Sequence, residues 1–142
     1  MDSTEVSLNT GSTRRIILDV EELAVKLPTE SDIDTRVEED RIEHRLNSRL
    51  HSFNDKPSVV WNNGMKEWHY RGIRNRKGDK PAIIREDGTQ MYYTNGKLHR
   101  TRGPAIIHAN GTVQYFNKGK RHRLVDRPAF IKPNGHREWW VD

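Results

Sequence analysis

The sequence contains no cysteine, so neither disulfide bonds nor thiolate metal ligands stabilise the fold. It is also poor in apolar residues, which make up 32% of its 142 residues, and its mean hydropathy is −0.98. This small apolar fraction leaves little material for a large globular core. No apolar run approaches the ~18 residues of a transmembrane helix, and no signal peptide is recognisable, so we expect no membrane insertion.

The usual sequence signals of an enzyme are missing as well. The chain has no nucleophile elbow, no glycine-rich loop of the phosphate-binding type, and no pair of carboxylates that stands apart from its repeats. All serines lie between Ser3 and Ser58. We therefore expect a protein that is not an enzyme and that carries no cofactor.

Charged and aromatic residues are divided unevenly along the chain. Residues 1–46 contain 6 Lys and Arg against 12 Asp and Glu, whereas residues 47–142 contain 19 against 8. No aromatic residue precedes Phe53. The sequence therefore predicts an acidic N-terminal segment, residues 1–46, followed by a basic part, residues 47–142.

The acidic segment is predicted to be partly disordered and then helical. We expect the first dozen residues, which are small and polar, to be disordered or loosely held. Residues 15–27 fit a strand followed by a short helix that Pro28 ends. A second helix is predicted over residues 32–50, because Ser31 suits an N-cap and apolar residues follow at helical spacing. These are Ile33, Val37, Ile42, Leu46 and Leu50.

The predicted helix needs a surface to pack against. One interpretation is that it caps the first end of a repeat array, as terminal elements often do. The other is that it pairs with a second copy, which would make residues 31–50 a homo-oligomer contact.

The basic part is built from repeats. Prolines occur at steps of 24, 23 and 24 residues, and a glycine follows each proline seven residues later. An aromatic residue lies four positions after each glycine. The sets are Pro57, Pro81, Pro104 and Pro128; Gly64, Gly88, Gly111 and Gly135; and Trp68, Tyr92, Tyr115 and Trp139.

The first three repeats each have the turn residues of two hairpins, and the fourth has those of the first hairpin. Asp87-Gly88 separates two runs rich in β-branched or aromatic residues, and Asn95-Gly96 predicts a two-residue turn immediately afterwards. A proline opens each unit, where it removes no hydrogen bond from a central strand. We therefore predict a mainly β fold, an array of four antiparallel β-hairpin repeats of about 24 residues, because one hairpin alone is only marginally stable. The structural turn glycines are Gly64, Gly88, Gly96, Gly111, Gly119 and Gly135.

Two phrases of the sequence, YYTNGKLHRTRGPAII and QYFNKGKRHRLVDRPAFI, resemble the MORN-type repeat (membrane occupation and recognition nexus) in its Asn-Gly-Lys, His-Arg, Gly-Pro-Ala variant. The resemblance covers about residues 47 to 142. Arrays of this kind occur in phage and giant-virus proteins and in some bacterial antitoxin-like proteins, where they are scaffolds that bind different partners. The resemblance implies a phage or viral protein that acts on a host or virion protein, and hence a cytoplasmic location in the host.

Two recurring polar positions have simple structural interpretations. His51, His99 and His122 occupy nearly equivalent places, but one histidine per repeat cannot converge on a single ion, so we expect no metal site. Asp55, Asp79 and Asp126 lie two residues before a proline and are interpreted as turn caps. Arg102 replaces this acid in the third repeat.

Basic and aromatic residues recur together in the turn regions. One aromatic of each adjacent pair is expected to fill the core and the other to face outward. If the turns stack on one side, a basic stripe beside exposed rings results. The candidate binding residues are Tyr92, Tyr93, Lys97, Arg100, Arg102, Tyr115, Phe116, Lys120, Arg121, Arg123, Trp139 and Trp140.

Three interpretations of this stripe remain open. The first is a binding surface for a protein partner with an acidic surface. The second is nucleic-acid binding without sequence preference. The third is that charged turns merely keep a thin array soluble.

The fourth repeat stops where its second turn is expected, which predicts an open strand at Trp139-Trp140. An exposed edge of this kind needs a cover. A second copy bound through residues 136–142, the N-terminal segment, or the functional partner would supply it.

Overall fold

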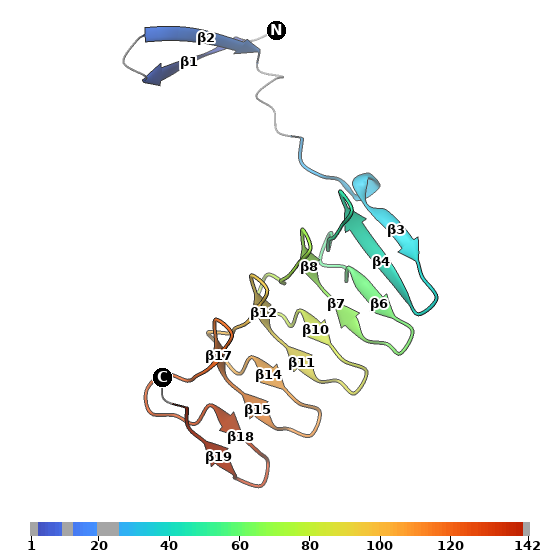
Figure 1. Cartoon of the computed structure of the whole chain (residues 1–142), viewed down its shortest axis with the longest axis vertical. Helices are drawn as coiled ribbons and strands as arrows, with labels where there is room; N and C mark the ends of the chain where they lie inside the picture. The colour runs from blue at the N-terminus through green and yellow to red at the C-terminus, as the bar shows by residue number, and fades with distance from the viewer. Residues whose placement is uncertain (1–2, 10–12, 20–25, 141–142) are drawn as a thin grey trace.

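The computed structural model describes residues 3–9 and 13–19 as backbone and residues 26–140 in full (Figure 1). The described chain is mainly β, as predicted. Its one helical element is a single 3-10 turn, η1 (Glu30–Asp32). The first strands, β1 (Ser3–Asn9) and β2 (Thr13–Asp19), form an antiparallel hairpin of their own.

This first hairpin bears on two expectations. Residues 3–9, expected to be disordered or loosely held, form a strand paired with residues 13–19. The strand predicted within residues 15–27 is confirmed by β2. The short helix predicted to follow it falls largely on residues 20–25, which lie outside the described residues.

The main sheet is a row of five antiparallel hairpins (Figure 1). Each hairpin pairs with the next through neighbouring strands, so that the sheet runs in the order β19-β18-β15-β14-β11-β10-β7-β6-β4-β3. The strands are β3 (Asp34–Val37), β4 (Arg41–Leu46), β6 (Val59–Trp61), β7 (Lys66–Glu67), β10 (Ile83–Ile84), β11 (Gln90–Met91), β14 (Ile106–Ile107), β15 (Val113–Gln114), β18 (Phe130–Ile131) and β19 (Arg137–Glu138).

A smaller hairpin follows each of the first four main hairpins. Tyr93 pairs with Leu98 across Asn95-Gly96, and both turn residues have positive φ, as the two-residue turn requires. All six predicted turn glycines have φ between 78° and 92°. The strands of these second hairpins are β5 (Arg49–Leu50), which pairs with the end of β4, then β8 (His69–Tyr70) with β9 (Ile73–Arg74), β12 (Tyr93–Thr94) with β13 (Lys97–Leu98), and β16 (Phe116–Asn117) with β17 (Lys120–Arg121).

The helix predicted over residues 32–50 is wrong. These residues form β3, β4 and β5 and belong to the same sheet as the repeats, so the array has a fifth hairpin and begins before residue 47. Asn47 and Ser48 take φ of 49° and 64°, which reverses the chain within the last turn of the predicted helix. Val37, a member of the predicted apolar stripe, is 78% exposed.

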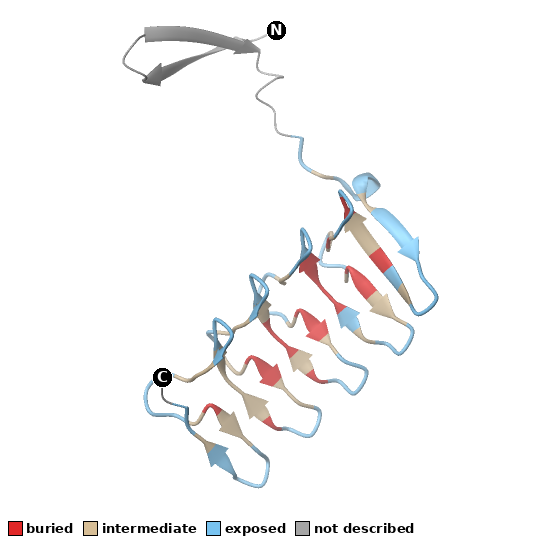
Figure 2. Ribbon diagram, in the orientation of Figure 1, coloured by how far each residue is buried: buried red, intermediate tan, exposed pale blue. Residues whose placement is uncertain are grey.

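The core is a narrow band along the sheet (Figure 2). Ile83, Met91 and Ile106 form its central cluster, and Tyr93 and Leu98 pack against them. The residue after each opening proline is small and fully buried. These residues are Ser58, Ala82, Ala105 and Ala129, each 0% exposed.

The turn at Gly96 provides a test of how tightly the units are joined. Gly96 has φ of 78°, and a Cβ there would lie 3.3 Å from Cγ2 of Ile73 in the preceding unit. We predict that Gly96→Val lowers the free energy of unfolding by about 1–2 kcal/mol, because a β-branched residue is strained in the left-handed region. The measurement is urea denaturation.

The matched control is Gly96→Asn. Asparagine tolerates positive φ, as Asn47 and Asn95 do in this chain, so its loss should be clearly smaller. Equal unfolding midpoints for the valine variant and the parent would contradict the predicted strain.

Candidate binding site

An arginine covers an aromatic ring in each of three successive units. Each arginine lies in the loop after a second hairpin, and each ring belongs to the residue that follows the second strand of the main hairpin. The guanidinium carbon lies 3.7, 3.8 and 3.8 Å from the ring centroid in the pairs Arg76–Trp68, Arg100–Tyr92 and Arg123–Tyr115. The guanidinium is attracted to the electron-rich face of the ring, and it covers that face.

In two of the three units the arginine is also held by a carboxylate of the preceding unit. Arg76 donates to Asp55 over 2.7 and 3.1 Å, and Arg100 donates to Asp79 over 2.8 and 3.0 Å. These two-point contacts hold the pKa of each aspartate below its usual range, mainly through the hydrogen bond from the arginine. The interpretation of Asp55 and Asp79 as turn caps is therefore wrong, because their carboxylates reach the next unit.

The third unit lacks this carboxylate. Arg102 occupies the position of Asp55 and Asp79, two residues before Pro104. Arg123 still lies over Tyr115 and donates to the carbonyl oxygen of Pro128 at 3.4 Å. Within residues 26–140 it makes no ion pair.

Three hollows lie one after another along the array, and each lies beside one of the rings covered by an arginine. Their volumes are about 440, 550 and 490 Å³. Asp55 lines the first and Asp79 the second, whereas no acidic residue among residues 26–140 lines the third. The walls of the third hollow include Arg100, Arg102, Arg123 and Arg127.

The ends of the second hairpins form a separate basic surface, which we call the tip row (Figure 1). Successive tips are joined by backbone bonds, from Gly72 to Leu50 at 2.7 Å and from Gly119 to Leu98 at 2.8 Å. No acidic residue occurs within the turns of residues 47–50, 71–74, 95–98 or 117–121. The exposed cations of the tip row are Arg49, Arg71, Lys97, Lys118 and Lys120.

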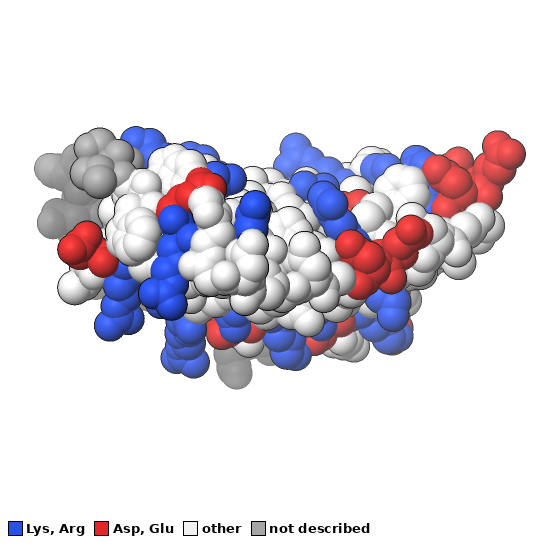
Figure 3. Space-filling model, turned by 90° about the horizontal axis from the view of Figure 1, so that it is seen from below, with Lys and Arg blue, Asp and Glu red and all other residues white. Residues whose placement is uncertain are grey.

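The opposite side of the array is more acidic. The turn between β3 and β4 contains Glu38, Glu39 and Asp40, and the turn between β10 and β11 contains Glu86 and Asp87. Figure 3 shows acidic side chains at the right-hand end, the end of β3 and β4 in Figure 1, and others elsewhere among basic ones. The acidic turns therefore lie opposite the tip row, although exposed cations such as Lys66, Arg85 and Lys132 lie on this side too.

The structure separates the predicted binding residues into exposed and covered groups. Lys97, Arg102 and Lys120 are exposed, as are Trp139 at 52% and Trp140 at 38%. The others are buried or half-buried by packing within the array: Tyr92, Tyr93, Tyr115, Phe116, Arg100, Arg121 and Arg123. The expected row of outward-facing tyrosines is therefore absent from these units.

Some residues of the tip row were missed as binding residues. Arg49 lay within the segment predicted as a helix, although Asn47-Ser48-Arg49-Leu50-His51 repeats the pattern Asn95-Gly96-Lys97-Leu98-His99. This second copy of the turn pattern was the signal that could have found it.

Two of the three histidines at equivalent positions, His51 and His99, connect neighbouring units. The Nδ1 atom of His51 accepts from the backbone N–H of Arg71 at 3.2 Å, and that of His99 accepts from Lys118 at 3.1 Å. Each histidine thus fixes the turn of the next tip. Within the described residues, no three His, Asp or Glu side chains are grouped so that they could hold a metal ion.

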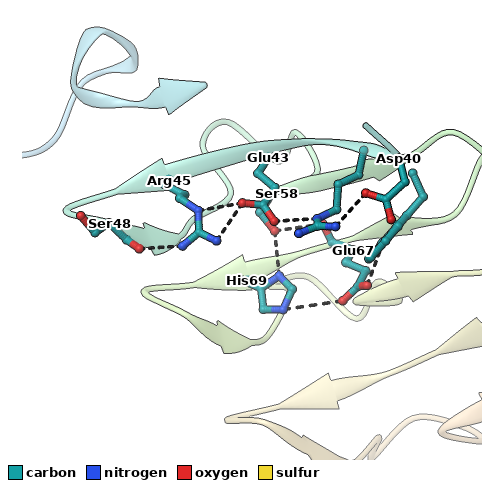
Figure 4. Close-up of polar contacts among 9 residues, drawn as sticks. Asp40, Glu43, Arg45, Ser48, Ser58, Glu67 and His69 are labelled. Atoms are coloured by element: carbon teal, nitrogen blue, oxygen red, sulfur yellow. Dashed lines mark hydrogen bonds and ion pairs between the residues drawn. The ribbon is translucent and has the colours of Figure 1, made fainter. Parts of the chain in front are cut away.

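A polar network crosses the first two units (Figure 4). Glu43, 5% exposed, accepts from the Nε atoms of Arg41 at 2.7 Å and Arg45 at 2.8 Å, and these bonds lower its pKa. Ser58 Oγ lies 2.8 Å from His69 Nδ1, and the other nitrogen of His69 lies 3.7 Å from Glu67. Ser58 is fully buried, so its hydroxyl cannot reach a substrate, and the network is a link between strands.

Comparison with family models, with curated proteins and with solved structures found no match to this chain. In the described part of the chain, no helix has the length and apolar character needed to cross a membrane.

The lowered carboxylate pKa values predict a loss of stability in acid. Asp55, Asp79 and Glu43 have lower pKa values in the folded chain than in the unfolded chain, so their contribution is complete above the unfolded values of about 4. It is lost as the pH falls below that range. Burial also lowers the pKa of His51 and His69, so stability should begin to fall as the pH drops below about 6.5. We expect a gradual fall of the urea midpoint in that range and a steeper fall below about pH 4.

The control is the double variant Asp55→Asn, Asp79→Asn. At neutral pH it should lose roughly 1 kcal/mol for each half-exposed pair, and its acid loss should be shallower. An identical acid profile for parent and variant would show that these pairs do not contribute to the pH dependence.

Proposed function

We propose that this protein is a non-enzymatic repeat scaffold that binds a protein partner with an acidic surface through the tip row. The observation that carries the proposal is the row itself. Five exposed cations stand on four successive turns, and backbone bonds and histidine contacts hold those turns in register. A fixed array of one sign of charge attracts a complementary surface and orients it.

The covered aromatics favour a protein over nucleic acid. Binding of single-stranded nucleic acid without sequence preference combines a basic groove with rings on which bases stack. Here arginines cover Trp68, Tyr92 and Tyr115 at less than 4 Å. The acidic turns of the opposite side would also repel a phosphate backbone that wrapped around the array.

The source and setting of the protein stay predictions. The resemblance to MORN-type repeats supports a scaffold role and a phage or viral protein that acts on a host or virion protein in the host cytoplasm. Self-association also stays a prediction. Among the described strands of the main sheet, β3 and β19 each have one neighbour, and these two edge strands fall within the predicted contact segments 31–50 and 136–142.

The test is capture of partners from cell lysate with and without nuclease, using a charge-reversed tip row. The variant Lys97→Glu, Lys118→Glu, Lys120→Glu should lose capture at least about tenfold, because like charges replace complementary ones at the contact. The matched control, Lys66→Glu, Arg85→Glu, Arg137→Glu, changes three exposed cations elsewhere by the same charge and should keep it.

Two outcomes would contradict the proposal. If capture disappears after nuclease treatment and binding to a random-sequence duplex falls steeply with salt, the partner is nucleic acid. If the control variant loses capture as strongly as the tip-row variant, net charge and not the tip row determines binding.

A further inference from the structure

The third hollow of the array is a basic site without an acid of its own. Its walls include Arg102, Arg123 and Arg127, together with Arg100, which pairs with Asp79 at 2.8 Å; Arg102 also lies near enough to Asp79 to lower the pKa of its carboxyl. Asp126, the acidic residue nearest in the sequence, does not line the hollow and makes no ion pair among residues 26–140. Cations crowded together in this way are stabilised by an anion between them.

The two preceding units show which anion fits. In each of them, the Nε and Nη2 atoms of the stacked arginine donate to the two oxygens of one aspartate. Arg123 lies at the same 3.8 Å from its ring as Arg100 does, and its Nη1 atom donates to a proline carbonyl in the same way. Its Nε and Nη2 atoms therefore face the place that a carboxylate occupies in the other two units.

The apolar wall beside Arg123 indicates that the carboxylate belongs to a polypeptide. A small anion would leave the apolar side chains of this wall exposed to solvent. Leu124 and Val125 are 69% and 82% exposed. Val125 has φ of 65°, which is rare for a β-branched residue, at the position where Asn54 and Gly78 stand in earlier loops. An exposed apolar pair next to an arginine fork suits a peptide that places an apolar contact beside its acidic side chain.

We propose that this hollow binds the carboxylate of an Asp or Glu side chain of the protein partner. The partner supplies from outside the group that Asp55 and Asp79 supply from within the chain. The inference rests on the proposed function, because it assigns one contact point to the acidic surface of that partner. The tip row would then orient the partner, and the hollow would fix its register.

The test restores the missing acid. The variant Arg102→Asp places a carboxylate where two neighbouring units already hold one, so it should fold and should raise the melting temperature by closing the contact with Arg123. The probe is a soluble oligoglutamate peptide, measured by calorimetry at fixed ionic strength. We expect its affinity to fall about ten- to a hundredfold, as for a lost charge-assisted two-point contact.

The matched control is Lys77→Asp, which makes the same charge change in the loop of an earlier hollow and should keep the peptide affinity. A second variant, Arg123→Lys, retains the charge and removes the fork, so it should weaken binding without the gain in melting temperature. If Arg102→Asp bound oligoglutamate as the parent does, the hollow would not be the site.

Inorganic phosphate at the same ionic strength is the second arm. If it raised the melting temperature of the parent but not of Arg102→Asp, and oligoglutamate did not, the site would be a phosphate site and the proposal would be overturned. If peptide binding were lost in Arg102→Asp while partner capture persisted, the inference would fail and the proposed function would stand. If the charge-reversed tip-row variant kept partner capture while the parent still bound oligoglutamate, the proposed function alone would be contradicted.

Discussion

The array depends on one small residue in each of its last four units, which bonds in two directions. The N–H of Ala105 donates to Gln114 within its own hairpin at 2.8 Å, and its carbonyl accepts from Tyr92 of the preceding unit at 2.7 Å. Ser58, Ala82 and Ala129 make the same pair of bonds. Each is fully buried, so a larger side chain would force neighbouring units apart. The stacking of units is therefore set by backbone bonding at a position where only a small side chain fits.

Backbone bonding fixes the repeat, so the side chains that pair between a main hairpin and the second hairpin after it can differ in kind from unit to unit. In each unit the two partners remain chemically compatible. Glu67 pairs with Arg74 at 2.8 Å, and at the equivalent positions of the next unit Met91 and Leu98 lie in or against the apolar cluster. One unit further on, Gln114 accepts from Arg121 at 2.9 Å. An ion pair, an apolar pair and a hydrogen bond from an arginine to a neutral amide thus fill the same space in turn. This explains how a chain with so few apolar residues keeps its interior satisfied.

The repeat was readable from the sequence because its turns need particular residues. Gly88 and Gly96 lie at positive φ, and the prolines precede the strands, so spacing alone located the hairpins. The first hairpin was misread, because its apolar residues fit a helical period and it lacks the opening proline. The better signal was the alternation of Arg41, Glu43 and Arg45. These residues lie on one face of a strand, where both arginines donate to the carboxylate of Glu43. The sequence did not predict that arginines cover the aromatic rings, because each stacked arginine lies eight residues after its ring, beyond the reach of local strand and turn patterns.

The arginine that lacks its aspartate shows what holds the other two in place. Arg123 keeps the ring distance of Arg100 although no carboxylate binds it among residues 26–140, so stacking on the ring and the bond to the Pro128 carbonyl are sufficient to position the guanidinium. The carboxylate of Asp55 or Asp79 then adds a link between units to an arginine that is already in place. A carboxylate that approaches Arg123 from outside therefore meets a guanidinium that is already held in place. Binding is favoured because no conformational entropy has to be lost to order this side chain. Arginine in place of aspartate at position 102 therefore leaves the stacking of the units and of Arg123 unchanged. It changes only the charge of the ligand that the third hollow can bind.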